Sequence, residues 1–151
     1  MNCLLADEEA TEEWAARLFR ALTPGCVVFL HGELGAGKTT LVRAALRAGG
    51  YRGPVKSPTY TLVEEYRLER GTVYHFDLYR IADPEELEWM GIRDFFRAHV
   101  ICFIEWPERG YGALPVADLD LSLAVHGTSR MLELTALSAK GRSVLAAMEK
   151  I

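Results

Sequence analysis

The stretch "FLHGELGAGKTTLVRAAL", residues Phe29–Leu46, places a glycine-rich turn between an apolar run and a segment with helical character. The run that leads into it, residues 26–31, is rich in valine and almost wholly apolar, which is typical of a strand buried on both faces of a parallel sheet. A helix is predicted to follow from about residue 38 to residue 48, where two glycines end it. The stretch therefore predicts a strand, a glycine turn and a helix in direct succession.

Four residues of this turn satisfy the pattern G-x-x-x-x-G-K-[ST]: Gly32, Gly37, Lys38 and Thr39. Such glycines let successive backbone N–H groups curl around phosphate oxygens at the amino terminus of a helix. Lys38 is expected to reach the β and γ phosphates of a nucleotide, and Thr39 to place its hydroxyl on Mg²⁺. The alternative is a glycine-rich turn that holds no ligand. The other loop residues belong to the same predicted nucleotide site: Glu33, Leu34, Gly35, Ala36 and Thr40.

The rest of the chain predicts one mixed α/β domain, residues 1–151, with a P-loop NTPase fold. Residues 7–21 have the period of an amphipathic helix, and residues 84–90 follow an aspartate cap as a short acidic helix. Two antiparallel hairpins are expected, over residues 60–79 and 119–137, with a buried strand over 100–105 and a last helix over 141–150. We therefore expect three layers, whose mixed sheet carries the hairpins.

Composition and charge exclude several classes of protein. Seventeen basic and 21 acidic residues give a formal net charge of -4, so a broad basic surface for nonspecific nucleic-acid binding is not expected. No stretch reaches the roughly 18 apolar residues of a membrane span, and the amino terminus does not resemble a signal peptide. Cys3, Cys26 and Cys102 lack metal or redox spacing. These features favour a cytoplasmic protein with reduced, noncatalytic thiols.

Two acids end apolar runs where strands would leave the sheet. Asp77 ends the run "VYHF", and Glu105 ends "VICFI". A site that hydrolyses nucleotides needs a carboxylate at such a strand end, to hold Mg²⁺ or to polarise an attacking water. Salt bridges, with Arg80 or Arg109, are the alternative. Both acids are predicted to belong to the metal site, with Lys38 completing the catalytic set.

Other polar and aromatic residues near these acids leave alternatives open. The segment "KSPTYTL" lies where many nucleotide hydrolases carry a switch, so Thr59 or Ser57 is expected to sense the γ phosphate, unless the segment only leads into a strand. Trp106 could stack on a partner, rest against the nucleotide or simply pack. His75 should share a sheet face with Asp77, and on its own it is more typical of a hydrogen-bonded structural histidine than of a ligand.

Four blocks, in order, carry a family resemblance: "HGELGAGKTT", "KSPTYTLVEEY", "YHFDLYRIADPEELEWMGIRDFF" and "FIEWPERG". From about residue 7 to residue 112 the chain resembles the bacterial TsaE (YjeE) family of small ATPases. The resemblance implies binding and hydrolysis of ATP with Mg²⁺, in support of the TsaB and TsaD proteins that make threonylcarbamoyladenosine in tRNA. It implies contact with tRNA at most through these partners.

The resemblance also assigns residues. It places the phosphate loop at residues 32–40, the metal site at Thr39 with Glu105 and Asp77, and the tryptophan of the family at Trp106. Thr11 and Arg130 are expected on the base and ribose side of the nucleotide. The segment "ADPEELEWMG" is expected to present acids and apolar side chains to a partner, with core packing of the apolar ones as the alternative.

Three rival functions use the same loop. A small-molecule kinase needs an arginine-bearing lid, and beyond residue 111 the chain has only Arg130 and Arg142 as arginines. A GTP-dependent switch would need an N-K-x-D segment, which is absent from the sequence, so adenine is favoured. A noncatalytic nucleotide-binding scaffold stays open on sequence alone.

Overall fold

The computed structural model describes residues 1–150, which form seven strands, four α-helices and two 3₁₀ helices. The strands are β1 (Asn2–Leu5), β2 (Val27–His31), β3 (Val63–Leu68), β4 (Gly71–Asp77), β5 (Ile101–Glu105), β6 (Leu119–His126) and β7 (Ser129–Ala136). The helices are α1 (Glu8–Ala21), α2 (Lys38–Ala48), α3 (Glu85–Trp89) and α4 (Ala139–Glu149), with 3₁₀ helices η1 (Ile92–Phe95) and η2 (Pro107–Gly110).

All seven strands belong to one mixed sheet, in the order β1-β7-β6-β2-β5-β4-β3. The four central strands, β6, β2, β5 and β4, run parallel to one another. Antiparallel pairs flank this centre, because β3 returns along β4 and β7 returns along β6, with β1 added outside β7. The expectation of a mixed sheet that carries antiparallel hairpins is confirmed.

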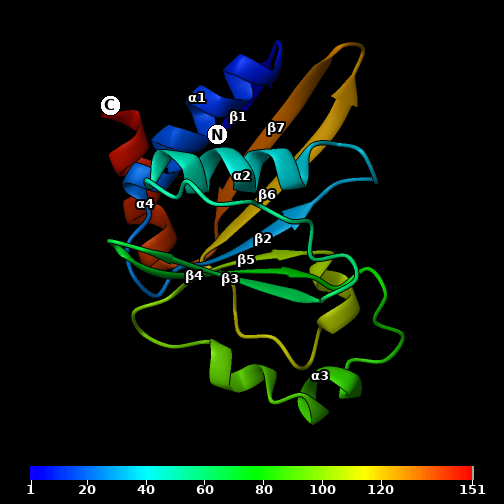
Figure 1. The fold of residues 1–151 in the computed structure, drawn as a ribbon. Helices are drawn as coiled ribbons and strands as arrows, with labels where there is room; N and C mark the ends of the chain where they lie inside the picture. The colour runs from blue at the N-terminus through cyan, green and yellow to red at the C-terminus, as the bar shows by residue number, and fades with distance from the viewer. Residues whose placement is uncertain (151) are drawn as a thin grey trace.

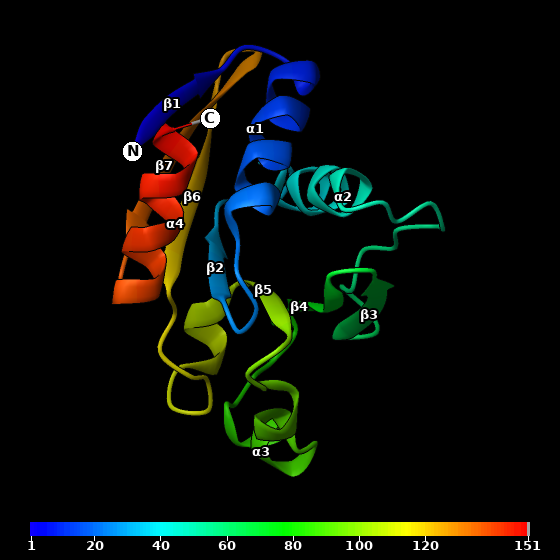
Figure 2. The ribbon, with the colours of Figure 1, turned by 90° about the vertical axis from the view of Figure 1, so that its left-hand side faces the viewer.

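The two faces of the sheet carry separate apolar clusters. One face packs against α1, α2 and α4 in a cluster that includes Leu18, Leu41 and Phe103. The other face is covered by α3, η1 and the segment after η2, through residues such as Phe76 and Leu87. Figures 1 and 2 show α3 on the side of the sheet away from α1 and α2. The central strands are apolar on both faces because both faces are covered.

Local sequence explains where the helices begin and end. Asp7 caps α1 by accepting a hydrogen bond from the amide of Ala10 at 2.8 Å, and Glu8 and Glu9 lie in the first turn, where the helix dipole favours acids. In the acidic segment, Asp83 accepts from the amide of Glu85 at 2.9 Å. The predicted helices over residues 7–21, 38–48, 84–90 and 141–150 are present within one or two residues.

The first strand was not predicted from the sequence. For the acidic segment, the sequence left open whether its apolar side chains are exposed or packed in the core. β1 pairs with β7 through long-range contacts that its four residues do not encode locally. In the acidic segment, Leu87 is fully buried, whereas Trp89 is 77% exposed. Core packing therefore holds for Leu87 and not for Trp89.

Chain direction positions the site. Because β2, β5 and β4 are parallel, the turn after β2 and the acids that end β4 and β5 lie at the same edge of the sheet. The register pairs Asp77 with Glu105 directly.

The cysteines Cys26 and Cys102 are buried and form no disulfide in the part of the chain that the structure describes. Burial raises the pKa of the Cys102 thiol to about 12. In residues 1–150 we find no helix long and apolar enough to cross a membrane.

Candidate nucleotide site

The glycine turn leaves room at the amino terminus of α2. Gly35 and Gly37 have φ values of 82° and 107°, in the left-handed region that favours glycine. A Cβ at either position would meet no atom within 4 Å, so the loop borders open space rather than the core. The start of α2 has no side-chain cap. Its first N–H groups are therefore available to an anion.

Lys38, the first residue of α2, is held beside this turn. Its side chain is only 5% exposed, and its ammonium donates a hydrogen bond to the carbonyl of Gly32. The same nitrogen lies 4.0 Å from the ring centroid of Trp106, in a cation–π contact. Burial lowers the pKa of Lys38, and the carboxylates of Glu105 and Asp77 oppose that shift. The lysine is thus pre-positioned beside the loop.

Glu105 is the most buried acid at this edge of the sheet, at 3% exposure. Its Oε2 atom accepts a hydrogen bond from the Thr39 hydroxyl at 3.2 Å and lies 2.5 Å from Nε2 of His75. A buried carboxylate is costly without such partners. Trp106 follows with left-handed backbone angles, φ 56° and ψ 50°, that a non-glycine residue rarely adopts. Backbone strain of this kind concentrates at functional sites.

Asp77 is held by the predicted switch segment. Its Oδ2 atom accepts from the Thr59 hydroxyl at 3.0 Å, and its Oδ1 atom accepts from the backbone N–H of Tyr79 at 2.9 Å. Thr59 in turn lies 2.8 Å from the Ser57 hydroxyl. The segment therefore reaches the site through two hydroxyls, in addition to leading into β3.

The alternative that these two acids form salt bridges with Arg80 or Arg109 is wrong. Within residues 1–150, no lysine or arginine forms an ion pair with Asp77 or Glu105. Arg80 lies over the ring of Tyr60 and Arg109 over the ring of Tyr79 instead, at 4.3 and 5.6 Å from the ring centroids.

These groups line one cleft of about 290 Å³, which we call the carboxylate cleft. It is lined by Leu34, Gly35, Gly37, Lys38, Thr39, Thr40, Ser57, Thr59, Asp77, Glu105 and Trp106. In residues 1–150 no three His, Cys, Asp or Glu side chains are arranged to hold a metal ion by themselves. Magnesium in nucleotide sites usually takes one or two carboxylates together with phosphates and waters. Thr39, Asp77 and Glu105 offer oxygen ligands of that kind, so the residues fit a magnesium nucleotide.

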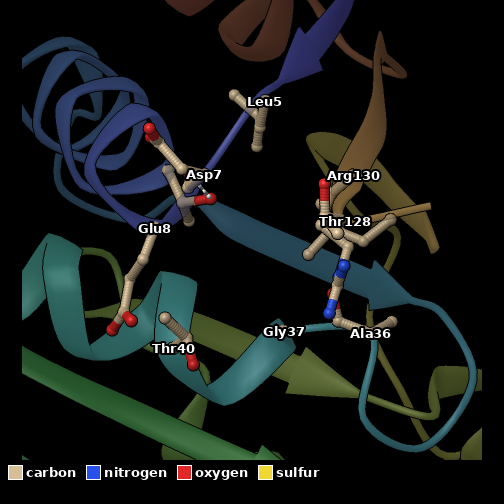
Figure 3. Close-up of a pocket in the computed structure, with 10 residues that line it drawn as sticks. Leu5, Asp7, Glu8, Ala36, Gly37, Thr40, Thr128 and Arg130 are labelled. Carbon is tan, nitrogen blue, oxygen red and sulfur yellow. Dashed lines mark hydrogen bonds between the residues drawn. The ribbon is translucent and has the colours of Figure 1, made fainter. Parts of the chain in front are cut away.

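A second cleft, of about 160 Å³, lies on the other side of the loop and is called here the arginine cleft. Its lining comes from the end of β1, the start of α1, the loop, α2 and the β6–β7 hairpin: Leu5, Asp7, Glu8, Thr11, Ala36, Gly37, Thr40, Leu123, Thr128 and Arg130. Figure 3 shows Arg130 reaching the loop at Ala36, with Glu8 of α1 near Thr40 of α2. The guanidinium Nε donates to the Ala36 carbonyl at 2.9 Å. Gly37 and Thr40 line both clefts, so the two are neighbours.

A family model described as threonylcarbamoyl adenosine biosynthesis protein TsaE matches residues 5–132. This match covers most of the chain, including both clefts and the loop between them. The chain belongs to the TsaE family. The resemblance read from the four sequence blocks is thereby confirmed, as is the coarse role that the family description gives, in threonylcarbamoyladenosine biosynthesis.

Individual proteins of the TsaE family are also similar to this chain in sequence or structure. The chain is 54% identical over 121 residues to the tRNA threonylcarbamoyladenosine biosynthesis protein TsaE of Haemophilus influenzae, covering 80% of this chain and 77% of that protein. It is 36% identical to the protein of the same name from Treponema pallidum, over 83% of this chain and 92% of that one. The crystal structure of YdiB from Bacillus subtilis superposes with a TM-score of 0.82 at 25% identity, covering 99% and 94% of the two chains.

The structure brings together nearly all residues that the sequence assigned to the site. The carboxylate cleft collects Lys38, Asp77, Glu105, Thr59 and Trp106, and the arginine cleft collects Thr11 and Arg130. Gly32 and Glu33 are the exceptions among the loop residues, because they line neither cleft. Glu33 is exposed, although its carbonyl accepts from the Ala36 amide at 3.0 Å.

Sequence reasoning missed several lining residues of this TsaE site. Asp7 and Glu8 were placed only in the helix predicted over residues 7–21, and no motif included Leu5, Leu123 or Thr128. Their common signal is tertiary, because three chain segments distant in sequence meet beside Ala36.

Proposed function

We propose that this TsaE-family protein binds ATP with Mg²⁺ and hydrolyses it, as an accessory ATPase of threonylcarbamoyladenosine formation in tRNA. One observation carries the proposal: the buried Lys38 ammonium and the Thr39–Glu105 hydrogen bond of 3.2 Å lie in the same cleft, at the uncapped start of α2. A lysine, a hydroxyl and a carboxylate grouped at a helix amino terminus suit a triphosphate and its metal ion.

Binding follows from the loop and the lysine. The N–H groups around Gly35 and Gly37 would surround phosphate oxygens, and Lys38 would exchange its bond to the Gly32 carbonyl for the β and γ phosphates. Such an exchange favours binding, because a partly desolvated ammonium gains an anionic partner. We propose on this basis that the mixed sheet and its glycine turn are a P-loop NTPase fold.

Hydrolysis would depend on the two acids. Thr39, Asp77 and Glu105 would supply the protein oxygens around magnesium, which neutralises phosphate charge when bound. Glu105 would also orient an attacking water and accept its proton. Thr59, now bonded to Asp77, would sense the γ phosphate by changing partners.

The arginine cleft would take the base and ribose. Thr11 is buried at its floor, and Arg130 closes the side nearest the loop. The cleft adjoins the carboxylate cleft through Gly37 and Thr40, which suits one extended ligand with its phosphates in one cleft and its nucleoside in the other. ATP is proposed over GTP because the sequence lacks an N-K-x-D segment.

TsaB and TsaD are the proposed partners, and membership of the TsaE family supports them. Slow turnover by the isolated chain and faster turnover in the assembly are expected. The exposed Trp89 on α3, beside the acids of the same segment, supports a protein contact there. A net charge of -4 favours contact with tRNA through the partners rather than directly.

The test measures phosphate release from ATP by the purified chain alone, with TsaB and TsaD, and with tRNA substrate, each with and without Mg²⁺. Magnesium-dependent release that rises with the partners, together with recovery of TsaB and TsaD in an ATP-dependent pull-down, is the expected result. Transfer of the phosphate to a metabolite, with neither partner recovered, would favour the kinase. Arg130 donates hydrogen bonds to the carbonyls of Ala36 and Ser129. These bonds hold it against the loop, which argues against its serving in the arginine-bearing lid of a kinase.

A further inference from the structure

His75 is a polar residue in an apolar layer. It lies in the middle of β4, and its side chain is fully buried. On its sheet face, Val73 two residues before it and Phe103, its partner on β5, are apolar, whereas Asp77 two residues after it and Glu64, its partner on β3, are acidic. An imidazole in such surroundings stabilises a fold less than an apolar side chain does, unless a hydrogen bond compensates it. Its position therefore calls for an explanation beyond packing.

The compensation comes from Glu105. Nε2 of His75 lies 2.5 Å from Oε2 of Glu105, and the Glu105 side chain is itself only 4% exposed. The N–H of an imidazole ring can donate to such a carboxylate oxygen. Nδ1 has no hydrogen-bond partner within residues 1–150. All hydrogen-bonding capacity that His75 uses is thus directed at one carboxylate oxygen.

This hydrogen bond determines which oxygen of Glu105 remains free to bind a ligand or a water. The Thr39 hydroxyl donates to the same Oε2 atom, from the start of α2. Two donors on two different elements therefore hold Oε2, and the hydrogen bonds of Glu105 within residues 1–150 leave Oε1 for a ligand or a water in the cleft. Of the two contacts, the one from His75 is shorter and comes from a side chain locked inside the sheet.

We propose that His75 is a positioning residue that orients the Glu105 carboxylate in the carboxylate cleft. The inference rests on the ATP hydrolysis proposed above and adds a residue to which the sequence analysis gave a purely structural interpretation. His75 itself touches neither nucleotide nor water. It acts through Glu105, so its loss reduces the hydrolysis step and leaves the grip of Lys38 and the loop on the phosphates intact.

The test compares three substitutions in the full-length chain. His75→Leu removes the donor and puts an apolar side chain of similar size in its place. His75→Gln keeps an N–H donor at about the same distance from the backbone. Val73→Ala is the matched control, because it opens a cavity on the same strand and face without touching Glu105. Each variant is measured for ATP affinity by calorimetry, for kcat with TsaB and TsaD, and for thermal stability.

His75→Leu should lower kcat by about 10- to 100-fold, the usual effect of removing a residue that orients a catalytic or metal-binding group. Its affinity for ATP should stay within about twofold of the parent, since uniform binding is unaffected. His75→Gln should recover most of kcat, and Val73→Ala should lose stability but not kcat. The proposal is overturned if His75→Leu keeps the parental kcat, or if Gln is no better than Leu. A loss of kcat in Val73→Ala equal to that of His75→Leu would overturn it too.

A second measurement needs no nucleotide and separates this inference from the proposed ATPase. In urea unfolding of the ligand-free protein, His75→Leu and Glu105→Ala should be coupled, because each removes one partner of the hydrogen bond, and the double variant should lose less stability than the sum of the single losses. If the parent never hydrolyses ATP, the proposed function fails, and coupling alone decides whether His75 orients Glu105. Additive losses refute the orientation. Should His75→Leu not fold, His75→Asn replaces it, because this shorter amide cannot reach Oε2 and should fall below Gln in both measurements.

Discussion

The carboxylate cleft and the arginine cleft share Gly37 and Thr40 but are built in opposite ways. The first places Lys38, Asp77 and Glu105, all nearly buried, at the ends of parallel strands and the start of α2. The second gathers residues of α1, the loop and the β6–β7 hairpin around Arg130, whose bonds go to backbone carbonyls. Buried charges with fixed partners suit chemistry, and a lining drawn from several segments suits recognition. The following predictions separate the two roles.

The largest effect is expected from Lys38→Ala. This substitution removes the ammonium proposed to bind the β and γ phosphates and leaves Asp77 and Glu105 without the neighbouring positive charge. ATP affinity should fall by more than about 100-fold, since hydrogen bonds to charged groups each contribute about 1.5–3 kcal/mol. Calorimetry with magnesium ATP measures it, with Lys140→Ala on α4 as control. Heat of binding equal to that of the parent would refute the phosphate role of this cleft.

Glu105→Ala should divide binding from chemistry. ATP should still bind, because the loop and Lys38 remain, whereas hydrolysis should fall by at least about 100-fold through loss of the proposed general base. Glu105→Gln keeps the shape but cannot accept a proton as a carboxylate does, so it should lose hydrolysis as well. Phosphate release is measured in the presence of TsaB and TsaD. Turnover at the parental rate in Glu105→Ala would remove Glu105 from the catalytic set.

Arg130→Ala probes the arginine cleft and should have the opposite effect to Glu105→Ala, with weaker ATP binding and unchanged hydrolysis. Loss of the guanidinium removes a hydrogen bond to the Ala36 carbonyl and a proposed contact with the nucleoside. We expect ATP affinity to weaken by about 10-fold, while kcat at saturating ATP is kept. The comparison variant is Arg67→Ala, an exposed arginine on β3. A fall in kcat with unchanged affinity would mean that the arginine cleft takes part in chemistry.

Trp89→Ala should have the smallest effect on either cleft. Its side chain is 77% exposed on α3, on the sheet face away from α1 and α2, and substitutions at such sites usually change stability by less than about 0.5 kcal/mol. Unfolding midpoint and ATP affinity of the isolated chain should match the parent. A large loss of ATP affinity would show that the α3 side is connected to the nucleotide site, contrary to the division drawn here.

The carboxylate cleft was largely predictable from sequence, and the arginine cleft was not. Lys38 and Thr39 belong to a contiguous motif, and Asp77 and Glu105 each end an apolar run, so local patterns marked every charged group of the first cleft. In the second cleft, Ala36, Gly37 and Thr40 were named as loop residues, and Thr11 and Arg130 were named only through the family resemblance. Leu5, Leu123 and Thr128 have ordinary side chains that no pattern distinguishes.

The fold divides in the same way. Helices α1 and α2 and both hairpins were predicted because periodicity, caps and glycines are local signals. Strand β1 was missed because its four residues acquire their role only by pairing with β7, more than 120 residues later in the chain. Exposure within the acidic segment was equally undecided, since the burial of Leu87 depends on which side of the short helix meets the sheet.

The sequence by itself determined every helix and strand of the site, the phosphate-binding pattern and the family, but not β1, because these features depend on residues that are neighbours along the chain. Only the tertiary structure decided which atoms meet. It showed that Glu105 bonds to Thr39 and His75 rather than to an arginine, and that Arg130 reaches Ala36. The physical reason is that a buried polar group takes whichever partner the strand register and the helix packing bring within hydrogen-bond distance. Local sequence patterns determine neither the register nor the packing.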